Sequence, residues 1–368
     1  MRAARYLSGR VVRGVLTLLT MIAVTFALYF AIETNPPVSL FFQGVGRGTP
    51  ATKQQTELVD RLFYLDRSKV GLYVSYVSHL VRGDLGHSTT LDHDRIVSAG
   101  SVAPRTFPAL RVTLSILLGG AVLVVLLSLP LGAVSGTRIG SWTDRVISFT
   151  ALVLLAMHPM MLGLILRSAG GRVDWLPTSG YCTFVEHPAP PLPTGLVVTP
   201  GSLPQPCGGP VDWATHLILP WLTFALLFLA LYTRMIRASV AETIEEDFVR
   251  TARAKGASQL RVLGRHVLPS AGIRVLTMVG MEIGTAIGVC VYIESAFSMR
   301  GLGSAAVFEL GGGSLFLDLP YLLAIVVLIT LIVIVGNLVV DLLYAALDPR
   351  VGVQRGTQRT KSLVGGVF

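Results

Sequence analysis

Charged residues are scarce in this sequence of 368 residues. Asp, Glu, Lys and Arg together make up 14% of it, whereas apolar residues make up 52% and the mean hydropathy is +0.66. In ordinary soluble domains about a quarter of the residues are charged. The 14% in this sequence cannot cover the water-exposed surface of a chain this long. The composition therefore excludes a soluble protein and predicts a membrane protein with several spans.

Cysteines and enzyme motifs are scarce as well. The chain has three cysteines, Cys182, Cys207 and Cys290, which excludes a disulfide scaffold and a four-thiolate metal site. It contains no His-Glu-x-x-His, no Gly-x-Ser-x-Gly and no phosphate-binding loop. We therefore predict no catalytic residue, no metal ligand and no cofactor bound by this chain. The net charge of +9 is typical of a membrane protein whose cytoplasmic loops are basic, so nucleic acid is not an expected partner.

Six windows are long and apolar enough to cross a bilayer, which takes about 20 residues. The fifth contains one charge, Glu282, and the others contain none. We expect helices at 14–32, 112–137, 146–166, 213–233, 275–293 and 319–340. The first window follows Arg2, Arg5, Arg10 and Arg13 as the core of a signal peptide would. It is too long for such a core and no convincing small-residue cleavage site follows it, so we predict an uncleaved helix.

The basic residues predict the orientation of the chain. With six spans both chain ends lie on one side. If that side is the cytoplasm, the inner segments hold 18 Lys and Arg and the outer segments 11. Eight of those 11 lie in 33–107, a segment long enough to be translocated whatever its charge. Both ends are therefore predicted to be cytoplasmic.

The spans divide the chain into four expected parts. These are the N-terminal cytoplasmic end with the first helix (1–32), an extracytoplasmic subdomain (33–107), a core with helices two to six (108–348) and a cytoplasmic tail (349–368). In the subdomain, Leu58, Leu62, Leu65 and the stretch 69–81 have helical spacing. The subdomain either gates a substrate or simply caps the first two helices, and the pattern leaves both open.

The outer loop 167–213 is rich in Pro and Gly and contains Cys182 and Cys207. Two cysteines on the oxidising side of a membrane, in a loop with little core of its own, favour a disulfide. Closing this loop would contribute about 3–4 kcal/mol on the chain-entropy model. Two unpaired thiols are the alternative. Cys290 lies inside a predicted helix, where packing is the expected role.

The cytoplasmic loop 234–274 begins with a pattern typical of an amphipathic helix. Two pairs have the spacing of capping boxes, Ser239 with Glu242 and Thr243 with Glu246. Apolar residues recur every four positions on one face, at Val240, Ile244 and Phe248. Gly256 is a favourable C-terminal residue, so we predict that this helix ends near it.

A second short helix is predicted after that turn. Ser258 can cap it, Leu260, Leu263 and Val267 lie on one side, and Pro269 should end it. A basic, structured hairpin of this kind is more than a connector needs. It either binds another protein or lies on anionic lipid, and periodicity alone does not separate the two.

The residues of this hairpin resemble a known motif. Residues 245–256 read Glu-Glu-Asp-Phe-Val-Arg-Thr-Ala-Arg-Ala-Lys-Gly, and nine residues later 266–269 read His-Val-Leu-Pro. They resemble the cytoplasmic loop of binding-protein-dependent ABC importer permeases, Glu-Ala-Ala, three residues, Gly, nine residues, Ile-x-Leu-Pro. Arg250 and His266 depart from that pattern, and the departures resemble the dipeptide, oligopeptide and nickel branch.

Four further segments resemble the same branch, so the similarity covers nearly the whole chain: 83–88, 176–181, 216–220 and 341–350. Two places do not match. The stretch 182–213 looks like an insertion, and Met299 and Arg300 stand before Gly301-Leu302-Gly303 where an apolar or aromatic residue and Pro are expected.

The resemblance implies a type I importer permease in a prokaryotic cytoplasmic membrane. Its implied partners are membrane lipid, a second homologous permease, two cytoplasmic subunits that use ATP and Mg, and an external substrate-binding protein. Peptides are the implied substrates, with nickel chelates or other small molecules as the alternative. The implied ATPase-coupling loop comprises Arg250, Thr251, Ala252, Arg253, Ala254, Lys255, Gly256, Ala257, Ser258, His266, Leu268 and Pro269.

A secondary transporter or a channel is the remaining rival. That class usually has intramembrane charges or broken helices, whereas Glu282 is the one carboxylate well inside a predicted span. Placing it in hydrocarbon costs about 2–3 kcal/mol or more, so it should face protein or water. It either bonds a neighbouring helix or lines a translocation path. Glu294, near the outer end of the same helix, is a second possible residue of the translocation path, but it is less telling because it can reach water.

Overall fold

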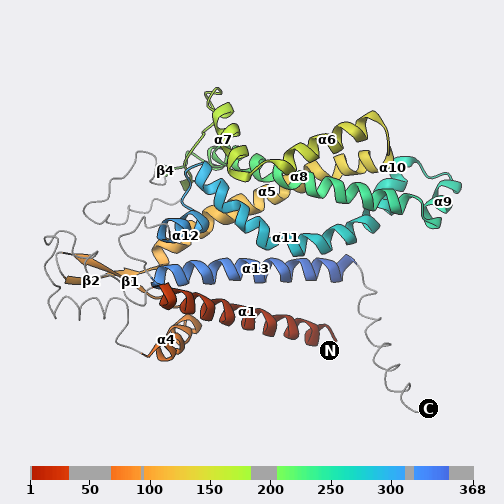
Figure 1. The fold of residues 1–368 in the computed structure, drawn as a ribbon. Helices are drawn as coiled ribbons and strands as arrows, with labels where there is room; N and C mark the ends of the chain where they lie inside the picture. Colours follow the sequence, from red (N-terminus) through yellow and green to blue (C-terminus); the bar gives the residue numbers. More distant parts are fainter. Residues whose placement is uncertain (1, 33–67, 93–94, 184–204, 311–318, 348–368) are drawn as a thin grey trace, which may run out of the picture. The chain divides into compact units, whose positions relative to one another are not determined.

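The computed structural model describes residues 2–32, 68–92, 95–183, 205–310 and 319–347. Figure 1 shows a mainly helical chain. Its helices are α1 (Arg2–Ile32), α4 (Lys69–Val81), α5 (Ala103–Thr137), α6 (Trp142–Ala156), α7 (Pro159–Gly170), α8 (Pro210–Ile244), α9 (Asp247–Ala254), α10 (Gln259–Val262), the π-helical η1 (Leu263–Val267), α11 (Leu268–Ala296), α12 (Leu302–Leu310) and α13 (Leu319–Leu347). An antiparallel hairpin of β1 (His87–Asp92) and β2 (Arg95–Ser101) was not predicted.

The predicted spans appear as long apolar helices. Within the described residues, five helices can cross a membrane by length and composition: Gly9–Tyr29, Ala103–Thr137, Pro210–Ile244, Val275–Ala296 and Leu319–Leu343. The bent pair of α6 and α7 makes a sixth if it counts as one span. The prediction of an all-α protein that crosses the membrane several times is confirmed.

The third predicted span, 146–166, is wrong as a single straight helix. α6 and α7 differ in direction by 106°. Pro159 causes the break, because proline has no N–H for the helix ladder and forces the preceding residue out of the helical conformation. His158 adopts that extended conformation, and its Nδ1 accepts a hydrogen bond from the Met160 N–H at 3.3 Å. His158 thereby caps α7, whose first residue is Pro159.

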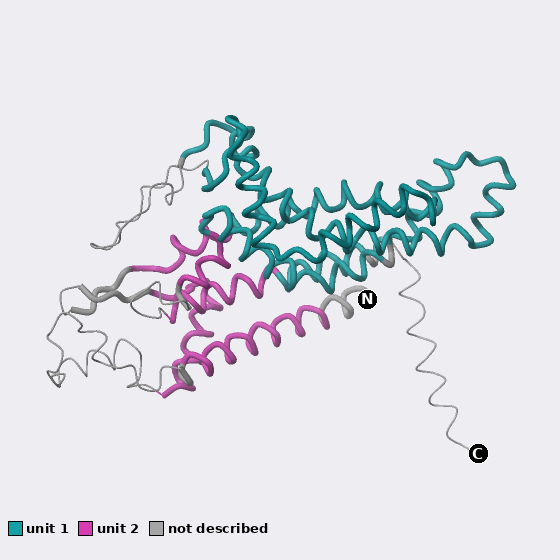
Figure 2. The backbone as a smooth tube through the Cα atoms, turned by 45° about the horizontal axis from the view of Figure 1, so that its top comes forward, with its two compact units in different colours: residues 1–3, 112–300, 333–368 teal, residues 4–111, 301–332 magenta. Residues whose placement is uncertain are grey.

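The structure divides into two compact units (Figure 2). Unit 1 comprises 1–3, 112–300 and 333–368, and unit 2 comprises 4–111 and 301–332. In unit 2, Phe26 of α1 meets Tyr73 and Tyr76 of α4 edge to face, with ring centroids 5.8 and 5.9 Å apart. Burial, together with the charge of Asp84, raises the pKa of Tyr76. The helical stretch predicted at 69–81 is confirmed as α4, while Leu58, Leu62 and Leu65 lie outside the described residues.

Helix α8 is the centre of unit 1, where α6, α7 and α11 pack against it. Two of the glycines through which helix α5 approaches α8 lie against the backbone of that helix. A Cβ atom on Gly132 would lie 2.6 Å from the Cβ of Ile236, and one on Gly136 would lie 2.7 Å from the carbonyl oxygen of Arg237. Small residues four apart are the usual device for close packing of membrane helices. The spacing of Gly132 and Gly136 therefore sets the α5–α8 contact.

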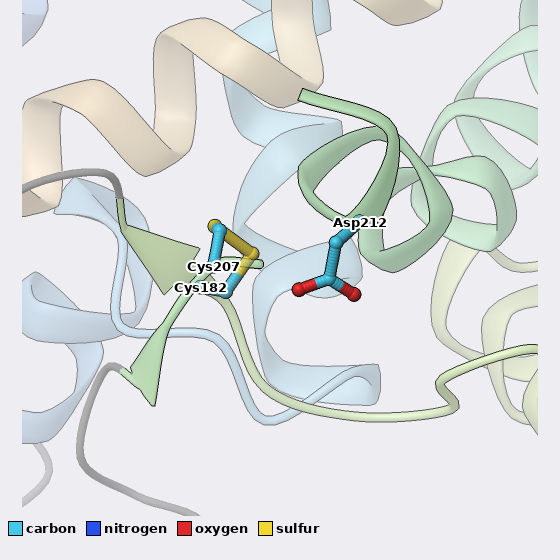
Figure 3. Close-up of side chains that lie close together, drawn as sticks. All are labelled: Cys182, Cys207 and Asp212. Atoms are coloured by element: carbon cyan, nitrogen blue, oxygen red, sulfur yellow. A yellow bond between two sulfur atoms is a disulfide. The ribbon is translucent and has the colours of Figure 1, made fainter. Parts of the chain in front are cut away.

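The outer loop is closed by a disulfide between Cys182 and Cys207 (Figure 3). The two-residue strands β3 (Cys182–Thr183) and β4 (Gln205–Pro206) pair beside it, and the Cys207 N–H donates to the Thr183 carbonyl at 3.0 Å. The residues between, 184–204, lie outside the described part of the chain. The structure thus places the two cysteines as the sequence predicts.

We predict that this disulfide is present in the mature protein. Digestion without reductant, followed by mass spectrometry, should release the peptides of Cys182 and Cys207 as one covalently linked species, because the loop faces an oxidising compartment. Cys290 is buried and free, so it serves as the control and should be alkylated after denaturation. Free alkylation of all three cysteines without reductant would contradict the prediction.

Candidate functional site

The loop 234–274, predicted to be cytoplasmic, contains a helical hairpin of α9, α10 and η1, which we call the coupling hairpin (residues 247–267; Figure 1). The predicted capping boxes before it are wrong. α8 continues to Ile244, so Ser239 and Thr243 are interior residues, and their hydroxyls donate to the carbonyls of Ala271 (3.3 Å) and Ser239 (2.7 Å). The chain turns at Glu245 and Glu246 before α9 begins. Continuous packing of α8 prevails over the local capping signals.

The turn at the tip has the geometry that the sequence predicts. Gly256 has φ +79°, which favours glycine. The Gly256 N–H donates to the Arg253 carbonyl at 2.9 Å and the Ala257 N–H to the Ala252 carbonyl at 3.2 Å. These two bonds form a Schellman motif. The last carbonyls of α9 are therefore satisfied and the turn is held in a single conformation.

Valines anchor the base of the hairpin. Val249, Val262 and Val267 are buried in the core cluster of unit 1, and Ala252, Ala257 and Leu263 pack against that cluster. The predicted apolar face is confirmed at Val240, which is buried, and at Ile244, which packs against the core cluster. It is wrong at Phe248, which is 40% exposed, whereas Val249 is buried. The turn at Glu245 and Glu246 causes this change, since it rotates α9 relative to α8.

The outer face of the hairpin combines apolar and basic side chains. Leu260 is 83% exposed, and the basic residues Arg250, Arg253 and Lys255 are exposed too. Arg250 lies 3.9 Å from Asp247, but both side chains are largely exposed, and such pairs stabilise little. Exposed leucine and phenylalanine beside basic residues are typical of a surface that binds a partner.

The second half of the hairpin runs into α11 without a stop. Ser258 adopts an N-cap conformation without a side-chain capping bond, and α10 leads through η1 to Leu268. The predicted end near Pro269 is wrong, because Pro269 lies in the first turn of α11, where its missing N–H is tolerated. His266 and Leu268 are half-buried there. The hairpin thus runs directly into α11, and the turn at Glu245 and Glu246 joins it to α8.

Glu282 lies on α11 two residues from Gly280 and from Gly284, so it points away from the face that these glycines share. Gly280 packs against Val340 of α13, where an added Cβ would lie 3.2 Å from that side chain, whereas Gly284 and Gly288 meet nothing within 4 Å. Glu282 itself is half-buried, and within the described residues it has no hydrogen bond. Within the described residues the alternative in which Glu282 hydrogen-bonds a neighbouring helix is thus not seen, although its carboxylate acts electrostatically on Tyr232 of α8.

Glu294 differs from its prediction. It has no exposed surface, and the Thr113 hydroxyl donates to its Oε1 at 2.6 Å. The expectation that Glu294 reaches water is wrong, because α5 covers it. Its own carbonyl also accepts the Met299 N–H at 2.8 Å. Glu294 thus joins α5 to the outer end of α11.

A group of possible metal ligands lies at the outer loop. Cys182, Cys207 and Asp212 bring their ligand atoms within 4.8 Å of one another (Figure 3). Both sulfurs are bonded to each other, and Asp212 accepts the Gly208 N–H at 2.9 Å. In the disulfide form this group offers no thiolate, so its arrangement supports loop closure rather than metal binding.

An ion pair between Asp144 of α6 and Arg237 of α8 was not predicted. Asp144 and Arg237 lie just outside the charge-free windows 146–166 and 213–233, so the sequence pattern assigns them only to the loops beside these spans. One local signal exists: Ser141 precedes Asp144 by three residues, and its Oγ accepts the Asp144 N–H at 3.2 Å. That signal predicts the start of a helix but says nothing of Arg237, 93 residues away.

Comparison with known proteins agrees with this architecture. The family described as binding-protein-dependent transport system inner membrane component matches residues 128–353. The oligopeptide transport system permease protein AppB of Bacillus subtilis is 32% identical over 281 residues, covering 76% of this chain and 79% of that protein.

Two further relatives match over almost their whole length. The di/tripeptide transport system permease protein DppB of Pseudomonas aeruginosa is 31% identical, covering 90% of this chain and 94% of its own. The glutathione transport system permease protein GsiC of Escherichia coli is 29% identical, covering 92% and 96%. The family match includes the coupling hairpin and the helices that hold it. This chain therefore belongs to the family of inner membrane components of binding-protein-dependent transport systems.

Proposed function

We propose that the chain is a permease subunit of an ATP-driven importer in a prokaryotic cytoplasmic membrane. A second permease completes the translocation path, two cytoplasmic subunits bind and hydrolyse ATP with Mg, and an external binding protein delivers the substrate. Peptides are the proposed substrates, because relatives that match most of the chain are named for oligopeptides, di- and tripeptides and glutathione.

The coupling hairpin carries this proposal. Its base is fixed by buried valines and its tip by the Schellman turn at Gly256, so it can transmit a displacement rather than bend. Its exposed face offers Leu260 and Phe248 as apolar anchors with basic residues around them. Docked in a groove of an ATPase subunit, the hairpin would turn closure of the ATPase pair into movement of α8 and α11.

The docking role predicts a selective effect of Leu260→Ala. Exposed apolar anchors dominate interface affinity, so this variant should raise the Kd of the permease pair for its ATPase subunits by about tenfold. The Kd would be measured in nanodiscs. Leu118→Ala is the matched control, because Leu118 is 62% exposed on the spanning helix α5, and it should leave the Kd unchanged.

The result also separates the two interpretations of the hairpin. If Leu260→Ala left the Kd for the ATPase subunits at its wild-type value and instead reduced contact with anionic lipid, the hairpin would be an interfacial membrane element. The docking role would then be wrong.

Glu282 is proposed to line the translocation path. It is half-buried and directly follows Met281, which is 75% exposed. A carboxylate in such a position can attract the amine of a peptide or a cationic side chain. Glu294, bonded to Thr113 and buried, is better explained as a link between helices.

Glu282→Gln should lower uptake of lysine-containing dipeptides in proteoliposomes by about fivefold, which corresponds to roughly 1 kcal/mol. The variant keeps the size of the side chain and removes its charge, so uptake of alanine dipeptides, measured in the same vesicles, should fall less. Wild-type uptake of every peptide, cationic ones included, would remove Glu282 from the path.

A further inference from the structure

Asp144, in the first turn of α6, binds Arg237 of α8 through both of its carboxylate oxygens. Arg237 Nε donates to Oδ1 at 2.6 Å and Nη2 to Oδ2 at 2.9 Å. The Asp144 side chain is 5% exposed and that of Arg237 31%. A guanidinium that meets a carboxylate in this fork fixes both distance and angle. The pair therefore sets the orientation of α6 relative to α8.

The same carboxylate also holds the end of α5 and the turn that follows. The Ser135 hydroxyl of α5 donates to Oδ1, and the Gly140 N–H donates to Oδ2 at 2.9 Å. Gly140 has φ +77°, so the turn takes a shape that favours glycine. The Asp144 side chain thus contacts α5, α8 and the α5–α6 turn together.

The backbones of α5 and α8 touch at this point. An added Cβ on Gly136 would lie 2.7 Å from the carbonyl oxygen of Arg237 and 2.9 Å from the Cβ of Val240. Backbone contact on one side and the ion pair on the other leave little freedom for α5, α6 and α8 to slide past one another. These contacts fix the positions of α5, α6 and α8 relative to one another along their axes.

The Asp144–Arg237 ion pair lies next to the coupling hairpin. Arg237 precedes Ile244, the last residue of α8, by two helical turns, and α9 begins just beyond. Figure 1 shows the turn between α5 and α6 at the same end of unit 1 as α9 and α10. A displacement of the hairpin therefore passes through the last two turns of α8 to Arg237 before it reaches the part of α8 that precedes Arg237.

A buried ion pair is a poor way to gain stability, since removal of both charges from water offsets their attraction. Its advantage over apolar contact is a fixed geometry. A membrane helix that must move together with its neighbour depends more on this fixed geometry than on a gain in folding stability.

We propose that Asp144 and Arg237 are positioning residues that make α5, α6 and α8 move as one body when ATP closes the ATPase pair. The inference rests on the proposed function, because the displacement enters through the coupling hairpin. Without the pair, the hairpin moves the end of α8, while α6 and the α7 that follows it lag behind. ATP is then hydrolysed without transport.

The test uses the complete transporter in proteoliposomes, with its second permease, ATPase subunits and binding protein. The measured quantity is the number of peptides transported per ATP hydrolysed. Asp144→Asn, Arg237→Gln and the double variant should each lower this ratio by about tenfold, the size of a typical coupling between sites. Arg237→Lys, which keeps the charge and loses the fork, should be intermediate. Arg234→Gln is the matched control, since Arg234 is exposed one turn earlier on α8, and it should keep the wild-type ratio.

The double variant separates positioning from folding. It leaves no unpaired buried charge, so the thermal unfolding temperature should recover relative to the single variants, whereas the ratio should stay low. Recovery of the ratio together with the unfolding temperature, a wild-type ratio in all variants, or loss of assembly in all of them including Arg237→Lys would overturn the inference. A wild-type complex that fails to retain ATPase subunits would instead contradict the proposed function.

Discussion

Helices in a bilayer gain little by burying apolar side chains against one another, because lipid tails are as apolar as leucine. Unit 1 is therefore held by close backbone approach and by a few polar bonds, and both converge on α8. Gly132 and Gly136 let α5 reach its backbone, and the Trp221 Nε1–H donates to the Ser115 carbonyl of α5 at 2.8 Å. Helices α6, α7 and α11 pack against the same helix.

The coupling hairpin follows from the same constraint. It protrudes beyond the spanning helices, so a stiff base has to come from the few side chains that it can bury. Val249, Val262 and Val267 supply that base within the core cluster. Of the residues left outside, Leu260 is 83% and Phe248 40% exposed within the described part of the chain, which suits a surface whose partner is another protein.

Local patterns were sufficient for five of the six spans, for α4 and for the turn at Gly256, because each depends on composition or on the conformation of one residue. These patterns failed where contacts between residues far apart in the sequence determine the structure. Ser239 and Thr243 have capping spacing, yet packing keeps them inside α8. Nothing near Glu294 indicates that Thr113 would cover it. The break at Pro159 could have been predicted from its missing N–H; a count of uncharged residues overlooks it.

The central claim is that the hairpin couples ATP hydrolysis to transport by this chain. The most direct measurement is peptide transported per ATP hydrolysed by the reconstituted transporter with Gly256→Asp, compared with Gly83→Asp. Both glycines have positive φ, +79° and +84°, and open space around them, so the two variants carry similar backbone strain. The account predicts a ratio lowered by about tenfold for Gly256→Asp and a nearly wild-type ratio for Gly83→Asp. A wild-type ratio for Gly256→Asp would contradict it.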